Sequence, residues 1–203
     1  MRRYSVVVAC IALLATFCLA QAKLEALEAT DLTTHPFSVD FASGGKLRLH
    51  VRSGEVHVIG EDRNRISVEL SGKRAADATG LKVRFENTKG TGDMHISGGP
   101  RNDLTITIRI PANTDLYARV PFGEVTVHHV IGNKDVELHA GDLTVAVNGP
   151  EDYSHVDASV YSGEVDAVAF GEEHGGLFRS FHRESSGPYR LHAHVGAGQL
   201  TLE

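Results

Sequence analysis

The sequence predicts an all-β protein built from stacked short strands, and three observations support this prediction. Apolar and polar residues alternate with a period of two almost everywhere from Pro36 onward, which is the pattern of half-buried strands. The 203 residues include 21 Gly, 6 Pro and no Trp, a composition that favours frequent turns and a core of small side chains. One short motif with a central Gly returns along the chain. These patterns disfavour long helices.

The first 22 residues have the pattern of a secretory signal. Arg2 and Arg3 form a positive start, residues 5–19 are apolar, and residues 20–22 (Ala-Gln-Ala) form a small-x-small cleavage site. The apolar run of about 15 residues is shorter than the roughly 20 that a membrane-spanning helix needs. We therefore expect a signal peptide over residues 1–22 and a single β-strand repeat (adhesin-like) domain over residues 23–203.

Charge and cysteine usage narrow the class of protein further. The formal net charge is −6 and becomes −8 once Arg2 and Arg3 leave with the signal, so we expect no nucleic-acid partner. Cys10 and Cys18 both lie in the signal, which leaves the exported chain without a disulfide or a thiol nucleophile. No second apolar run follows, so we expect a periplasmic or secreted, cell-surface protein of a bacterium with no integral membrane anchor after signal cleavage.

The alternation places the expected strands in order along the chain. Apolar residues occupy every second position of each segment, so that one face of each strand is buried. The only helical turn that we expect lies in residues 73–80. The expected strands cover residues 47–51, 66–70, 81–85, 104–110, 116–120, 136–140, 143–147, 156–160 and 189–195.

The repeated motif consists of a strand end, a Gly, an acidic or amide residue, and renewed alternation. Each Gly is expected to adopt positive φ at a corner, which other residues adopt only at a cost. Stacked copies favour a right-handed β-helix-like solenoid, with rungs about 4.8 Å apart. The alternative is an antiparallel β-sandwich, in which the two arms of each copy pair as a hairpin. The corner glycines are Gly54, Gly123, Gly141, Gly163 and Gly198.

Two segments carry a resemblance to a known family. Residues 44–70 (GGKLRLHVRSGEVHVIGEDRNRISVEL) and 108–127 (IRIPANTDLYARVPFGEVTV) resemble the bacterial DUF4097 family, whose members are also called adhesin-like or β-strand repeat proteins. The resemblance covers roughly residues 37–203. It implies a right-handed, solenoid-like β fold and a role in the cell envelope or at the cell surface. The family carries no catalytic residues to transfer to this chain.

An acidic or amide side chain follows every corner glycine. Stacked carboxylates would repel one another, and a divalent cation such as Ca²⁺ could relieve that repulsion. The sequence has no calcium-binding loop of the D-x-D-x-D-G type, so we expect these side chains to be solvated instead. The row consists of Glu55, Glu124, Asp142, Glu164 and Gln199.

Histidines are the most unusual feature of the composition, with 12 in the chain. His192 and His194 lie on one strand face and could supply two ligands of a zinc or copper site. The sequence names no third ligand, so we expect solvated histidines, no metal site and no cofactor. Other histidines at outward positions are His50, His57, His128, His129 and His139.

For catalysis, only an analogy with polysaccharide-cleaving β-helices is available. It would use Asp157, Arg119 and Lys134 in a groove, and nothing else in the sequence supports it. We therefore expect no enzyme. The sequence favours a structural or adhesion-like protein that binds an envelope or surface component, either a protein or a glycan. A metal-binding or sensing protein is the second hypothesis, and a polysaccharide-acting enzyme is the third.

Overall fold

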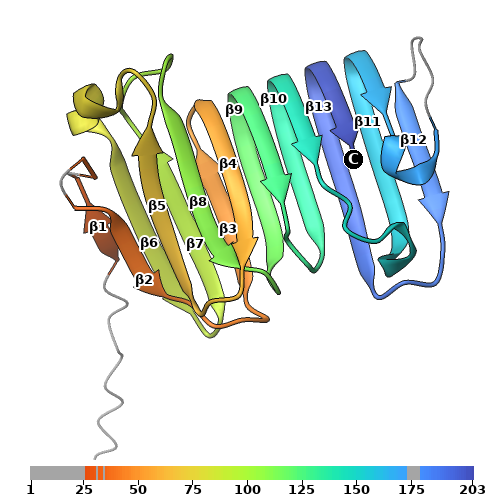
Figure 1. Cartoon of the computed structure of the whole chain (residues 1–203), viewed down its shortest axis with the longest axis horizontal. Helices are drawn as coiled ribbons and strands as arrows, with labels where there is room; N and C mark the ends of the chain where they lie inside the picture. Colours follow the sequence, from red (N-terminus) through yellow and green to blue (C-terminus); the bar gives the residue numbers. More distant parts are fainter. Residues whose placement is uncertain (1–25, 31, 34, 173–178) are drawn as a thin grey trace, which may run out of the picture.

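The structure is a computed structural model that describes residues 26–30, 32, 33, 35–172 and 179–203. The expected signal peptide lies outside these residues. Within them, helices are too short and too polar to span a membrane. Thirteen strands join into one mixed sheet (Figure 1), which confirms the all-β prediction. The strands are β1 (Leu27–Ala29), β2 (Phe37–Asp40), β3 (Lys46–Val51), β4 (Gly54–Glu61), β5 (Arg65–Ser71), β6 (Lys82–Thr88), β7 (Thr91–Ser97), β8 (Thr105–Pro111), β9 (Asp115–His128), β10 (Lys134–Val145), β11 (Tyr153–Asp166), β12 (Ser180–Glu184) and β13 (Tyr189–Leu202).

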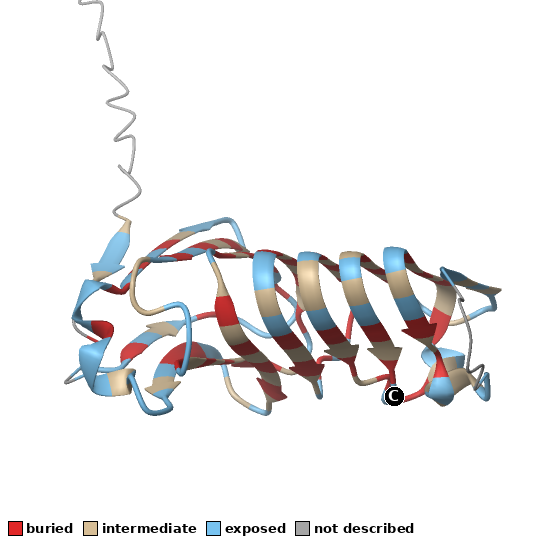
Figure 2. Cartoon of the chain, turned by 90° about the horizontal axis from the view of Figure 1, so that it is seen from above, coloured by how far each residue is buried: buried red, intermediate tan, exposed pale blue. Residues whose placement is uncertain are grey.

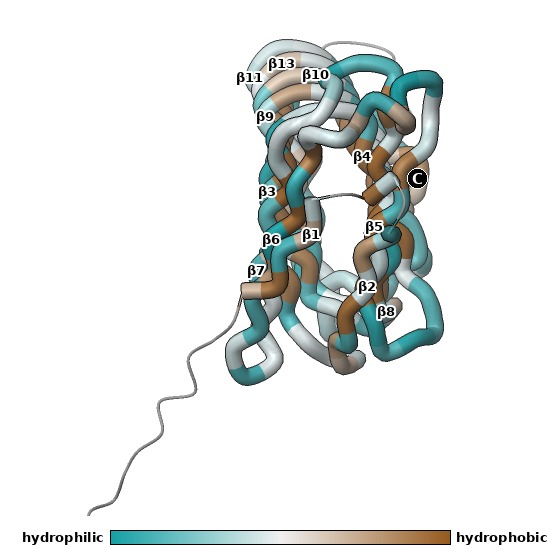
Figure 3. Tube along the Cα trace, turned by 90° about the vertical axis from the view of Figure 1, so that its left-hand side faces the viewer, coloured by the Kyte–Doolittle hydropathy of each residue, from teal (hydrophilic) through white to brown (hydrophobic). Residues whose placement is uncertain are grey.

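The sheet folds over on itself into two facing layers, as the end-on view shows (Figure 3). Each of the long strands β9, β10, β11 and β13 bends at its corner glycine, so that its first arm lies in one layer and its second arm in the other (Figure 2). β3 and β4 make the same turn as two strands, as do β7 and β8. We call each such pair of arms a rung.

Neighbouring rungs are parallel and in register. The corner glycines form one line in the order Gly54, Gly123, Gly141, Gly198, Gly163. All five have positive φ, between 129° and 142°, as the sequence predicts. The arms of one copy pair with the arms of the next copy rather than with each other, so the copies do not form the hairpins expected in the sandwich alternative, although the two facing layers are sandwich-like.

The order of the rungs departs from the order of the chain. β13 lies between β10 and β11 and is parallel to both, although it is the last of the three in sequence. β9 pairs with β3 and β4 on one side, whereas β7 and β8 pair with them on the other. Antiparallel strands flank the stack: β6 and β5 at one end, with β1 and β2 beyond them, and β12 at the other.

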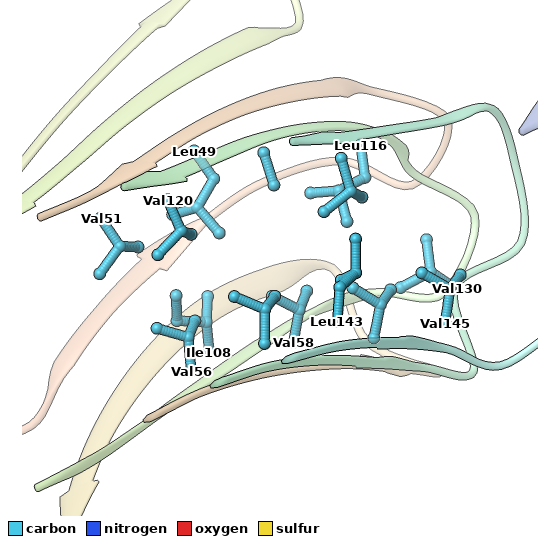
Figure 4. Close-up of a cluster of buried hydrophobic side chains, with 14 of the residues drawn as sticks. Leu49, Val51, Val56, Val58, Ile108, Leu116, Val120, Val130, Leu143 and Val145 are labelled. Atoms are coloured by element: carbon cyan, nitrogen blue, oxygen red, sulfur yellow. The ribbon is translucent and has the colours of Figure 1, made fainter. Parts of the chain in front are cut away.

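The core lies between the two layers. Leu49 and Val51 of the first layer point toward Val56 and Val58 of the second (Figure 4), and all four are at most 2% exposed. Burying each of these side chains stabilises the fold by roughly 1.5–3 kcal/mol. The expected helical turn is present as the short 3₁₀ helix η1 (Ala75–Gly80), and two further 3₁₀ turns are η2 (Pro150–Asp152) and η3 (Val168–Phe170).

Candidate functional site

The outward surface of the first layer carries most of the histidines of the described chain. Alternation along each arm sends these side chains away from the core, and the parallel register aligns them in rows across the strands. None of them is buried. We call this surface the histidine face; its histidines are His50, His95, His139, His155, His182, His192 and His194.

A shallow groove of about 620 Å³ crosses the histidine face. It passes over the first arms of five neighbouring strands, in the order β7, β3, β9, β10, β13. Strands lie about 4.8 Å apart, so five of them present a groove about 19 Å wide across the sheet. Its ionisable side chains are those of His50, His95, His139, His194, Arg52, Arg119 and Glu137.

Arg119 is fixed in the middle of this groove. Its guanidinium group lies 2.8 Å from a carboxylate oxygen of Asp135 and 3.0 Å from one of Glu137. The same group lies 3.6 Å from the centre of the Tyr117 ring, a cation–π contact. Because two carboxylates already neutralise it, Arg119 leaves little positive charge for a ligand.

Two other arginines have no carboxylate partner among the described residues. Arg52, at the corner end of the groove, is exposed and forms no ion pair with any described residue. A second hollow of about 530 Å³ continues around the corner and shares Arg52 and Pro121 with the groove. Arg101 lines this hollow and is likewise exposed and unpaired within the described chain, while Phe122 adds an aromatic side chain that is 55% exposed. The two hollows together form a path that holds two unpaired arginines and, in the second hollow, the carboxylates of Glu55, Asp103 and Glu124.

His50 and His95 stack at the β7 end of the groove. Their ring centres are 4.6 Å apart and their planes differ by 11°. Burial, followed by the neighbouring imidazole of His95, lowers the pKa of His50 below its usual value of 6.5. His50 is therefore neutral at pH 7 and can accept a hydrogen bond on one ring nitrogen.

The acidic row lies on the outward surface of the second layer, as the repeat predicts. The register aligns it in the order Glu55, Glu124, Asp142, Gln199, Glu164. Because β13 enters between β10 and β11, the neutral amide of Gln199 separates Asp142 from Glu164. This insertion relieves part of the repulsion that the sequence suggests, and no described group of three close metal ligands includes a member of the row.

His192 and His194 share a face, as the sequence predicts, but each has a partner of its own. Nδ1 of His192 lies 3.1 Å from a carboxylate oxygen of Asp135, and Nδ1 of His194 lies 2.9 Å from the hydroxyl of Ser159. The structure therefore does not bring the two histidines together as one ligand pair. The expectation that this pair binds no metal stays a prediction.

Three groups of histidine and carboxylate side chains, which the sequence alone does not predict, meet on the histidine face. In each group, one ligand atom from each of three residues lies within 4.8 Å of the others. In two of the groups, a carboxylate and a histidine lie two residues apart on one strand, which is a pattern visible in the sequence. The third member of each comes from a strand that is a neighbour in the sheet but distant in sequence. The groups are His50, Asp93 and His95; Asp135, Glu137 and His192; and His155, His182 and Glu184.

The residues of the proposed polysaccharide-cleaving groove do not meet. Lys134 points into the core and is 1% exposed, with its ammonium group donating a hydrogen bond to the hydroxyl of Tyr153. Arg119 lies on β9, and Asp157 lies on β11, with β10 and β13 between them. The alternation within β10 explains the error, because Lys134 occupies an inward position in register with Leu116 and Leu191.

The fold and the face together define a class: an all-β protein of parallel, in-register rungs with a long, histidine-lined groove on one layer. It is similar to a "putative cell adhesion protein" from Clostridium sporogenes, with a TM-score of 0.50 at 14% identity, over 88% of this chain and 99% of the other. This likeness shows a shared fold.

Two further solved structures are similar to a smaller degree. A "putative lipid binding protein" from Parabacteroides distasonis has a TM-score of 0.30 at 10% identity, over 82% of this chain and 61% of the other. A "putative adhesin" from Bacteroides fragilis has a TM-score of 0.27 at 9% identity, over 88% and 97%. No family model and no curated protein matches the chain.

Proposed function

We propose that the chain is an exported, non-catalytic β-repeat protein of the bacterial cell envelope, which binds an envelope or surface component as an adhesion-like module. The observation that carries this proposal is the groove across β7, β3, β9, β10 and β13, continued around the corner by the second hollow. A shallow path over several strands suits an extended partner better than a small substrate, which needs enclosure. No cofactor and no turnover form part of the proposal.

Two arginines along this path can bind anionic groups of a partner, beside the carboxylates of Glu55, Asp103 and Glu124 that line the same hollow. Arg52 and Arg101 are exposed and unpaired within the described chain, so an anionic ligand can bind them without displacing a carboxylate. The rest of the molecule is acidic, with a net charge of −6 over the whole chain. Long-range attraction to a polyanion is therefore weak, and binding depends on the local arginines.

The proposal also covers the family and the architecture of the chain. We infer that the chain is a DUF4097-like protein and that its rungs are the coils of a solenoid-like fold. The parallel alignment of the corner glycines supports this inference, as do the motifs in residues 44–70 and 108–127. The Clostridium sporogenes protein of similar fold is named for cell adhesion, and we assign a role of that kind here.

Export is part of the proposal because of the features of residues 1–22. A positive start, an apolar run and an Ala-Gln-Ala site direct a chain into the secretory pathway. Both cysteines lie in this segment, so the remaining chain has no thiol to protect in an oxidising compartment. We place the protein in the periplasm or at the cell surface.

Binding of the purified protein to immobilised alginate, an acidic polysaccharide, and to dextran, a neutral one, tests the proposed function, alongside capture from envelope fractions. We expect alginate binding at low salt, and a loss of at least tenfold in affinity in Arg52→Glu. The matched control is Arg65→Glu, which makes the same charge change on β5, away from the groove. Equal loss in both variants would show that net charge alone governs binding; retention on neither polysaccharide nor any envelope fraction would overturn the proposed function.

A further inference from the structure

The edge strand β12 brings two potential metal ligands beside a third on β11. His182 and Glu184 are two residues apart on β12 and therefore share a face, and Glu184 is in register with His155. Oε1 of Glu184 lies 2.9 Å from Nδ1 of His155 and 3.5 Å from Nε2 of His182. One carboxylate oxygen thus faces a nitrogen of each imidazole.

These distances fit the coordination sphere of a small transition-metal ion. Zinc binds histidine nitrogen and carboxylate oxygen at about 2.0–2.2 Å, so tetrahedral ligand atoms lie about 3.4 Å apart. The two carboxylate-to-imidazole distances of 2.9 and 3.5 Å bracket that spacing. Only small side-chain shifts are needed, because both Glu184 and His182 are more than half exposed.

Ring orientation separates this group from the stacked pair on β3 and β7. The imidazoles of His155 and His182 lie 4.9 Å apart at an interplanar angle of 76°. The nitrogen lone pair of an imidazole lies in the plane of its ring, so the lone pairs of two strongly inclined rings can point at one metal ion. The rings of His50 and His95 are nearly parallel, at 11°, so their in-plane lone pairs run side by side instead.

The charge around the carboxylate also separates this group from the one on β10. Asp135 and Glu137 already neutralise the guanidinium group of Arg119. Glu184 forms no ion pair with a described arginine or lysine; among the described side chains, its ion-pair partners are the two imidazoles, and it is 70% exposed. A divalent cation at Glu184 therefore does not compete with a fixed arginine.

We propose that Nδ1 of His155, Nε2 of His182 and Oε1 of Glu184 bind one divalent transition-metal ion, Zn²⁺ or Cu²⁺, with water completing the coordination. Two imidazoles and one carboxylate form the donor set that such ions prefer over Ca²⁺ or Mg²⁺. The ion joins β12 to β11, whose antiparallel pairing covers only five residue pairs at the edge of the sheet. This site is separate from the groove and does not depend on the proposed function.

Calorimetric titration of the metal-free protein with ZnCl₂ tests the site, together with the visible absorption of a Co²⁺-loaded sample. We expect one equivalent bound with a Kd in the micromolar range or below, and Co²⁺ bands of a four- or five-coordinate nitrogen and oxygen site. His155→Ala, His182→Ala and Glu184→Gln should each weaken binding at least tenfold. Because all three side chains lie at the surface, the metal-free variants should keep the circular dichroism of the parent.

Controls use the other histidines of the same face. The double change His192→Ala plus His194→Ala, and the single change His95→Ala, should leave the affinity unchanged. Hydrogen exchange distinguishes this site from adventitious surface binding, which would not protect β12. Zn²⁺ should slow exchange of the β12 amides by tenfold or more. Absence of saturable binding would overturn the proposal, as would loss of binding in either control or in none of the three site variants.

Discussion

The backbones of Gly141 and Gly198 meet at the corner of the stack, so closely that a Cβ atom on Gly198 would lie 1.9 Å from the carbonyl oxygen of Gly141. The same relation repeats along the line, with 2.0 Å for Gly123 against Gly54 and 1.7 Å for Gly163 against Gly198. Glycine is required here for space as well as for positive φ. Gly54, at the end of the line, also has positive φ, but the nearest atom to a Cβ there would be 3.7 Å away.

This difference gives the first prediction. Gly54→Ala should cost roughly 1–3 kcal/mol, the strain of an unfavourable φ alone. Gly198→Ala adds a clash with a backbone that cannot move without opening the rung, and should cost more than about 4 kcal/mol or prevent folding. Urea unfolding of both variants measures the two effects. Equal destabilisation would contradict the close approach of the corners.

The second prediction concerns the buried lysine. Desolvation by burial lowers the pKa of Lys134 from 10.5 to about 8, with a smaller opposing effect of Asp152. Below pH 8 the ammonium is charged in both folded and unfolded chains, and its burial costs about 3 kcal/mol. Between pH 8 and 10.5 the folded chain releases its proton first, so this group makes stability rise with pH.

Lys134→Met should therefore stabilise the protein at pH 7 by about 1–3 kcal/mol, and the advantage should shrink as the pH rises to 10. Above pH 10 parent and variant both lose stability, because burial raises the pKa of Tyr153 to about 12 and its hydroxyl therefore ionises first in the unfolded chain. Urea unfolding at pH 7, 8, 9 and 10 provides the measurement, with Lys134→Met plus Tyr153→Phe as the control for the orphaned hydroxyl. A pH-independent difference between parent and variant would refute the assignment.

A third prediction tests the role of the amide in the acidic row. Gln199→Glu places a charge between Asp142 and Glu164 and should cost about 1 kcal/mol at low ionic strength. The cost should vanish in 1 M NaCl, where charges about 5 Å apart are screened. Gln199→Met is the neutral control. A salt-independent loss in Gln199→Glu would point to packing rather than repulsion.

A fourth prediction concerns the start of the exported chain. Cleavage after residues 20–22 makes Lys23 the first residue of the protein in the periplasmic or culture fraction. N-terminal sequencing of that fraction decides the matter. An intact Met1 start in the membrane pellet would contradict it.

The repeats and the alternation predict much of this fold. The corner glycines and their positive φ values follow from the motif, because only a recurring structural need places Gly at the same point of five copies. β7 is hidden from a pattern search because its inward position 92 is Gly, covered by the rings of Phe85 and Phe41, which a Cβ there would approach to 2.8 and 3.0 Å. The edge strand β12 is hidden because its sequence, SFHRE, has a single apolar residue, Phe181, and so shows no apolar alternation.

The candidate site is harder to predict because it depends on which strands become neighbours. His182 and Glu184 are close in sequence, but their partner His155 lies on another strand. Likewise, His50 and His95 stack only because β3 and β7 pair. The alternation fixes that these side chains face outward, whereas long-range strand order decides which of them meet.

The insertion of β13 between β10 and β11 bears on how the chain assembles. When β11 has left the ribosome or the export channel, its native neighbour, residues 189–202, has yet to follow. β10 and β11 carry the same glycine corner, so each offers the other a matching parallel edge in the meantime. Any such pairing must separate before β13 can enter, and contacts of long sequence separation form slowly. The similarity between the copies, which aligns the rungs in the folded protein, therefore also allows β10 and β11 to pair wrongly during folding. A chain that stops before residue 189 would expose the unpaired edges of β10 and β11 to other chains.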